Sequence, residues 1–151
     1  MHKRREARKL ALQILFANEF LKEDITSVAA RISESVSEKV PQFTRDLLRI
    51  TTENHRELDE LIRNHLRNWD FNRVAILDRI LIRLALSELL YFPDIPAEVT
   101  INEAIEISKD FCSPKARRFI NGILDAIYKE LLKQKKIQKN ISTQIHIKKQ
   151  T

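Results

Sequence analysis

Apolar residues recur every three or four positions along most of this chain, which places them on one face of an α-helix. The first stripe, over residues 3–22, comprises Ala7, Leu10, Ala11, Ile14 and Leu15. A second, shorter helix is predicted over residues 26–39, with Thr26 as a candidate N-cap. Residues 41–68 continue as one long helix, in which the polar stretch 51–57 is a place for a bend. No segment requires a β-strand.

The helix predicted at residues 73–91 is apolar almost all round, which is typical of the centre of a helical bundle. A turn at residues 69–72 precedes it, with Asp70 or Asn72 as the next N-cap. The charged residues that this helix keeps are expected either to pair internally or to face a partner: Asp78, Arg79, Arg83 and Glu88.

Two short motifs predict the starts of the last two helices. The sequence TINE at residues 100–103 has the form of a capping box, in which the threonine and glutamate side chains bond the first amides of the helix. Ser113 followed by Pro114 has the form of an N-cap and first helical residue. With a last helix ending near Lys133, the chain is predicted to be an all-α helical bundle.

The composition excludes several other classes of protein. One glycine and four prolines are too few for a β-sandwich, a barrel or a glycine-rich nucleotide-binding loop. The lone Cys112 and four scattered histidines give neither a disulfide nor metal-ligand spacing. No apolar run approaches the roughly 18 residues of a membrane span, and the charged N-terminus lacks the pattern of a signal peptide. We therefore expect a cytoplasmic protein without a metal or cofactor.

Positive charge is concentrated at the two ends of the chain. The formal net charge is +6, with +4 in residues 1–9, +6 in residues 133–151 and −4 in the body between them. We expect a helical domain at residues 1–133 and a basic, disordered tail at residues 134–151. Basic ends on a mildly acidic body indicate a polyanionic partner and leave another face for a different partner.

The first helix carries basic residues that could neutralise phosphates, with an aromatic ring on which a base could stack. These candidates are Arg4, Arg5, Arg8, Lys9 and Phe16. The alternative is an ordinary solvated face, with Phe16 in the core.

A second basic cluster, Lys115, Arg117 and Arg118, begins the last helix next to Phe119. Because the helix dipole favours acids at that end, three cations there indicate an anionic partner. Phe119 lies at the edge of the apolar stripe, and its position favours the core. Gly122 costs about 1 kcal/mol relative to alanine inside a helix, which close helix packing, or else the approach of a ligand backbone, would explain.

No arrangement of residues indicates catalysis. Asp78 and Glu88 are ten residues apart, so they lie on different sides of their helix. No serine, cysteine or lysine has an activating neighbour in sequence, and Cys112 is expected to be structural. The chain is therefore not expected to be an enzyme.

Four blocks in order resemble the family of the bacterial transcription antitermination factor NusB: REARKLALQILF, AILDRILIRLALSEL, DIPAEVTINEAIEISKDF and KARRFINGILD. The resemblance covers residues 4 to about 130. It implies six to seven helices in two packed three-helix halves. It also implies an adaptor that pairs with the ribosomal protein NusE, holds single-stranded boxA-type RNA, and helps RNA polymerase to read through ribosomal RNA operons.

Carried over by position, the resemblance places an arginine-rich RNA-binding motif on Arg4, Arg5 and Arg8. Phe16 matches a frequent tyrosine near the RNA, and Phe119 matches an aromatic that contacts a base. The central helix is implied to face NusE, and the partner-binding candidates there are Asp78 and Ile82.

The chain departs from the family pattern in four places. Glu6 interrupts the arginine run, Lys115 stands where relatives can carry an acid, and the lysine tail is extra. Residues 69–72 replace a more acidic segment that in the family helps to face NusE. Two other interpretations remain open: a protein-interaction or homodimerisation module with solubilising basic ends, and the targeting domain of a longer RNA methyltransferase.

Overall fold

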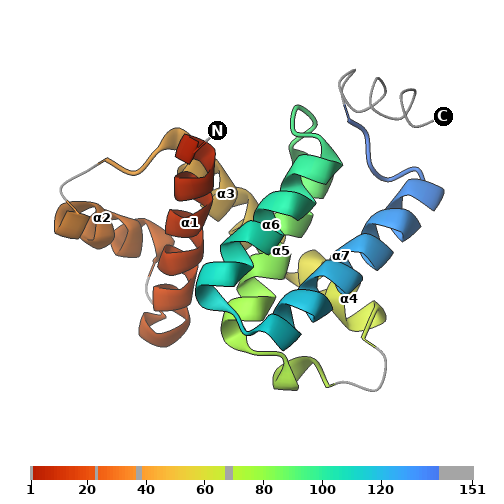
Figure 1. Ribbon diagram of the computed structural model, residues 1–151. Coiled ribbons are helices and arrows are strands. Elements are labelled where there is room, and N and C mark those ends of the chain that lie inside the picture. Colours follow the sequence, from red (N-terminus) through yellow and green to blue (C-terminus); the bar gives the residue numbers. More distant parts are fainter. Residues whose placement is uncertain (1, 23, 37–38, 67–69, 140–151) are drawn as a thin grey trace.

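The computed structural model describes residues 2–22, 24–36, 39–66 and 70–139 of the chain (Figure 1). Within these ranges seven α-helices and one 3₁₀ turn make up the regular structure, and there is no strand. The prediction of an all-α fold with six to seven helices is therefore confirmed. Trp69, in the predicted turn, and residues 140–151, the larger part of the disordered tail predicted at residues 134–151, lie outside the described residues.

The N-terminal half consists of α1 (His2–Leu21), α2 (Ile25–Val36) and α3 (Gln42–Glu53). The apolar stripe of α1 faces inward as predicted, and Ala11 and Ile14 are completely buried. The predicted N-cap at Thr26 is wrong, because the amides of Ser27 and Val28 both donate to the Asp24 carbonyl and the helix starts at Ile25.

The long helix predicted over residues 41–68 is two helices, α3 and α4 (His55–Asn64), separated at Asn54. The backbone amide of Asn54 and its side-chain Nδ2 both donate to the Ile50 carbonyl, at 3.1 and 2.7 Å. An asparagine side chain that bonds a nearby backbone carbonyl in this way competes with the hydrogen bonds that would continue the helix. The break lets α4 turn so that Leu58 and Ile62 become fully buried.

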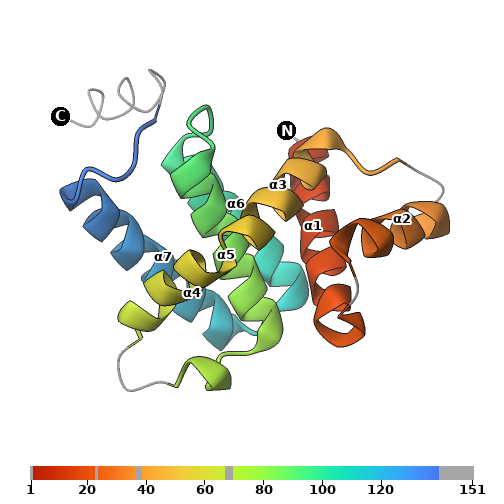
Figure 2. The same ribbon diagram turned by 180° about the vertical axis from the view of Figure 1, so that it is seen from behind.

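The C-terminal half is built around α5 (Ile76–Tyr91), which the short turn η1 (Phe71–Arg73) precedes and α6 (Ala97–Phe111) and α7 (Pro114–Lys133) follow. Figures 1 and 2 show α5 in the middle of the molecule, between α1 on one side and α7 on the other. α6 lies in front of α5 in Figure 1, and α3 and α4 lie in front in the reverse view of Figure 2. Residues 80–89 are all buried, so the central place predicted for this helix is confirmed. Asp70 accepts from the amide of Asn72 and caps η1, and α5 begins later, at Ile76.

The two predicted helix starts have opposite outcomes. Ser113 accepts from the amide of Ala116 at 3.0 Å and Pro114 is the first residue of α7, as predicted. The capping box at residues 100–103 is wrong, because the amide of Thr100 already donates to the Pro96 carbonyl and α6 begins one turn earlier.

No helix of the described residues packs closely against Gly122, so the prediction that close packing explains this glycine is wrong. It lies on the exposed face of α7, and a Cβ built there would have no heavy atom of the described residues within 4 Å. Its position leaves open the other explanation, the approach of a ligand.

The chain turns back onto the core after α7. Lys135 has a φ of 55°, and the amide of Lys136 donates to the Leu131 carbonyl. Lys139 Nζ then donates to the carbonyls of Glu88 and Phe92 at 2.8 and 2.9 Å, near the end of α5.

Candidate nucleic-acid interface

The basic residues of α1 face the acids of the neighbouring helix α6. Arg5 Nε and Nη2 donate to the carboxylate of Glu103 at 2.7 and 3.1 Å, and Lys9 Nζ lies 2.8 Å from Asp110 Oδ2. The hydrogen bond to Glu103 raises the pKa of Arg5, and the bond to Asp110 raises that of Lys9. The two pairs fix α1 alongside α6.

Arg8 lies deeper than its neighbours, with 5% of its surface exposed. Its Nε and Nη2 both donate to the carboxylate of Glu88 on α5 at 2.8 Å, and Thr100 Oγ1 donates to the same carboxylate at 3.0 Å. Arg8 thus forms a buried bidentate pair. By contrast, Arg4 is exposed, and its guanidinium carbon lies 4.8 Å from the centre of the Phe43 ring.

Phe16 is partly buried and packs against the core, so much of its ring is unavailable for stacking. It meets Phe20 edge to face, with ring centres 5.0 Å apart. Phe20 is 64% exposed and presents the larger free aromatic surface, although it was not among the sequence candidates. Its spacing of four residues from Phe16 is the only sequence signal for it.

A pocket of about 220 Å³ opens where α5 and α7 begin. We call it the Phe119 pocket, and its lining residues are Arg73, Val74, Ala75, Asp78, Ser113, Lys115, Ala116 and Phe119. The fold therefore brings together three residues selected from sequence, Asp78, Lys115 and Phe119. It adds Arg73, which no sequence signal indicated. Phe119 both packs against the core and lines the pocket.

The acidic residue of the Phe119 pocket, Asp78, is bonded to a neighbouring side chain. Asp78, which is 9% exposed, is hydrogen-bonded to the Cys112 thiol. Burial, and then the bond to Asp78, raises the pKa of Cys112 to about 12. Cys112 is consequently a neutral thiol near pH 7, in agreement with a structural role.

The remaining candidates differ in exposure. Lys115 and Arg118 are exposed, Arg117 is partly buried, and Ile82 is completely buried in the core. Ile82 therefore has no surface with which to touch a partner directly.

The α6–α7 connection links the two basic regions. The pair of Lys9 with Asp110 holds the middle of α1 against the last turn of α6. Ser113, which lines the Phe119 pocket, follows Asp110 by three residues.

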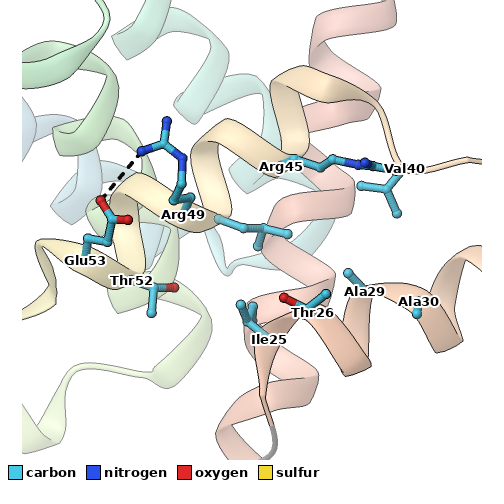
Figure 3. A pocket seen from close by; sticks show the side chains of 10 residues that line it. Ile25, Thr26, Ala29, Ala30, Val40, Arg45, Arg49, Thr52 and Glu53 are labelled. Atoms are coloured by element: carbon cyan, nitrogen blue, oxygen red, sulfur yellow. Dashed lines mark ion pairs between the residues drawn. The ribbon is translucent and has the colours of Figure 1, made fainter.

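A larger hollow of about 660 Å³ lies between α2 and α3, away from these residues. Figure 3 shows Thr26, Ala29 and Ala30 facing α3 across it, and Arg49 turned toward Glu53. The described residues contain no group of three or more metal-ligating side chains. Among them, no helix is long and apolar enough to cross a membrane.

The fold defines a small all-α protein, a bundle of two packed halves on which aromatic rings lie next to basic side chains. Comparison with known proteins identifies the family. The NusB family model matches residues 5–129. The chain belongs to the NusB family, so the resemblance found in the sequence is confirmed.

Curated relatives carry the name transcription antitermination protein NusB. The protein of Geobacter sp. strain M21 is 40% identical over 84% of this chain and 94% of its own length. That of Salinibacter ruber is 36% identical over 92% of this chain and 89% of its own. That of Chloroherpeton thalassium is 42% identical over 85% of this chain, which spans only 62% of that longer relative.

Solved structures share the fold. T. maritima NusB superposes with a TM-score of 0.75 at 39% identity, covering 84% of this chain and 91% of its own. A structure of antitermination factors NusB and NusE in complex with dsRNA gives a TM-score of 0.78 at 24% identity, covering 86% and 98%. At that identity the second match supports the fold alone.

Proposed function

We propose that this chain is a cytoplasmic transcription antitermination adaptor that binds single-stranded boxA-type RNA together with ribosomal protein NusE. In this role it promotes read-through and processing of ribosomal RNA operons, and its contact with RNA polymerase is indirect. The names of relatives 36–42% identical to the chain support this function.

The observation that carries the proposal is the Phe119 pocket. An aromatic wall with cations on its rim suits an unpaired base and the phosphates on either side of it. Phe119 supplies the wall, and Arg73 and Lys115 lie beside it. We assign Phe119 to base stacking and the two cations to phosphate neutralisation.

The other basic candidates fall into two groups, those that are exposed and those whose charge is paired with a carboxylate. Arg4 and Arg118 are exposed and are assigned to phosphate contacts. Arg5, Arg8 and Lys9 act mainly by holding α1 in place, because their charges are already paired with carboxylates. Arg117 is partly buried and interacts electrostatically with Cys112, so we assign it to support of the α6–α7 turn.

The remaining assignments concern aromatic and partner contacts. Phe16, with Phe20 beside it, offers a second stacking surface. Asp78, at the pocket, is the acidic contact for NusE, and Ile82 supports α5 from the core.

The adaptor role requires no catalytic step and no cofactor. In keeping with it, the raised pKa of Cys112 makes that thiol a poor nucleophile at neutral pH. The carboxylates of Glu88 and Glu103 are bonded to arginines and are not placed as a general acid and base.

The test is binding of a labelled boxA-type RNA and a scrambled control by the full chain, with and without NusE, over a salt series. We expect tighter and sequence-selective binding with NusE. Affinity falls as salt rises, and each phosphate contact should add about 0.7 to the steepness of the plot of log affinity against log salt. Arg118→Gln should therefore reduce the steepness of this salt slope by about 0.7. The control Arg45→Gln, which changes an exposed arginine of α3, should leave it unchanged.

Equal, weak binding of both RNAs that NusE does not change would overturn the adaptor role. A protein-interaction or homodimerisation module would then be the better interpretation, and sedimentation of the free chain would show whether it self-associates.

A further inference from the structure

A cluster of arginines surrounds one aromatic ring next to the Phe119 pocket. The guanidinium carbons of Arg63, Arg79 and Arg83 lie 4.3, 5.1 and 6.0 Å from the centre of the Phe71 ring. They come from α4 and α5, whereas Phe71 belongs to η1 and is 7% exposed. The ring thus gathers cations from two helices into one place.

Among the described residues, Arg83 alone of these three arginines pairs with an acid. Arg83 donates to Asp59 at 2.6 and 3.1 Å. Within the described part of the chain, Arg63, Arg73 and Arg79 lie within 4.0 Å of no carboxylate. The Nε of Arg79 is buried and bonds no acceptor of these residues. We call Phe71, Arg63, Arg73 and Arg79 the Phe71 patch.

The Phe71 patch is continuous with the Phe119 pocket. Arg73 lies in the same turn as Phe71 and also lines the pocket. Figures 1 and 2 show η1 beside the start of α7, below α5. A nucleic-acid strand that leaves the pocket across Arg73 therefore meets the other two arginines next.

The chemistry of the patch fits phosphates better than an acidic protein surface. Stacked guanidinium groups keep their planar donors in a fixed orientation, which suits bidentate contact with phosphate. Protein interfaces usually need a buried apolar centre. The large apolar side chains that are exposed among the described residues lie on α1, α6 and α7, and not on α4 or η1: Phe20, Leu21, Val99 and Leu132.

We propose that the Phe71 patch is a second phosphate-binding surface, which holds the backbone of the same RNA strand whose base lies in the Phe119 pocket. The inference rests on the proposed RNA-binding function and extends the footprint from α7 across η1 to α4. It accounts for three exposed or partly exposed arginines, Arg63, Arg73 and Arg79, that pair with no carboxylate of the described residues.

The test compares Arg63→Gln/Arg79→Gln with Arg45→Gln/Arg49→Gln, an equal loss of charge on α3. The RNA probes are the boxA-type sequence alone and the same sequence extended at each end. For one extended RNA we expect the patch variant to weaken binding several-fold and to lower the salt slope by about 1.4, two contacts at about 0.7 each. The short RNA and the α3 variant should show little change. Thermal unfolding verifies that each variant is folded, and Arg63→Lys/Arg79→Lys should retain most of the slope.

Three results would overturn the inference. Slopes equal to wild type on every RNA, with Arg118→Gln still lowering them, would reject the patch and leave the proposed function intact. Loss of NusE binding without RNA, at an unchanged RNA slope, would assign the patch to an acidic protein surface. If Phe119→Leu and Arg118→Gln also leave boxA binding unchanged, the proposed function fails as well.

Discussion

The basic residues of α1 and those around the Phe119 pocket are chemically alike but are used differently. On α1, Arg5, Arg8 and Lys9 each meet a carboxylate of α5 or α6 at 2.7–2.8 Å. Among the described residues, no carboxylate lies within ion-pair distance of Lys115 or Arg118. A run of cations in the sequence therefore does not by itself measure the positive charge that a partner meets. The acids that the fold brings beside the run decide it.

The largest expected effect comes from removing one of the paired basic residues of α1. Arg8→Ala would leave Glu88 buried without its bidentate partner, and loss of one member of a buried pair costs about 3–5 kcal/mol. The free energy of unfolding in urea should fall by that amount, while Arg118→Ala on the exposed side should change it by less than about 0.5 kcal/mol. A small loss for Arg8→Ala would show that the pair is not a main support of α1.

The next largest effect is expected from removing the aromatic ring of the Phe119 pocket. Phe119→Leu keeps an apolar side chain against the core but removes the stacking surface, which is worth about 1–3 kcal/mol per base. Affinity for boxA-type RNA should fall by about five- to 150-fold. The matched control is Tyr128→Leu, a partly buried aromatic that packs against the core from the later part of the same helix. Equal losses in the two variants would attribute the effect to folding.

A smaller effect is expected at Gly122, on the same helix as Phe119. Since an added methyl group meets no neighbour, Gly122→Ala should raise the free energy of unfolding by about 0.5–1 kcal/mol. Weaker RNA binding by this more stable variant would indicate that a ligand approaches α7 at Gly122. Unchanged binding would place the RNA elsewhere on α7.

The last prediction concerns Lys139, which, unlike Lys9 of α1, bonds backbone carbonyls and, among the described residues, no carboxylate. Burial lowers the pKa of Lys139 to about 8, although Glu88 and Glu98 oppose the shift. Between pH 8 and the ordinary pKa of 10.5, the unfolded chain binds this proton and the folded chain does not. Stability from this site should therefore rise with pH over that interval.

The measurement is the difference in free energy of unfolding between wild type and Lys139→Met, taken at several pH values. The difference should grow in favour of wild type from pH 8 to 10.5. Taking the difference cancels the common titration of Tyr91 and Tyr128, whose pKa values burial raises. A constant difference would contradict the lowered pKa.

The sequence by itself determined the elements whose signals are local. Apart from the break at Asn54, spacing of apolar residues located the helices to within a few residues, and Ser113 followed by Pro114 marked the start of α7. The uniform apolarity of residues 80–89 placed α5 at the centre. These signals need only neighbours within one or two helical turns, so they can be read without knowledge of the fold.

Tertiary structure alone decided where the polar side chains went. Thr100 and Glu103 have the form of a capping box, yet they bond Glu88 and Arg5, which lie 12 and 98 residues away in sequence. Arg8 similarly finds Glu88 at a separation of 80 residues. A buried charge must find a partner wherever the packing places one. The same packing brought Arg73 beside Phe119, and no short-range pattern records such a contact.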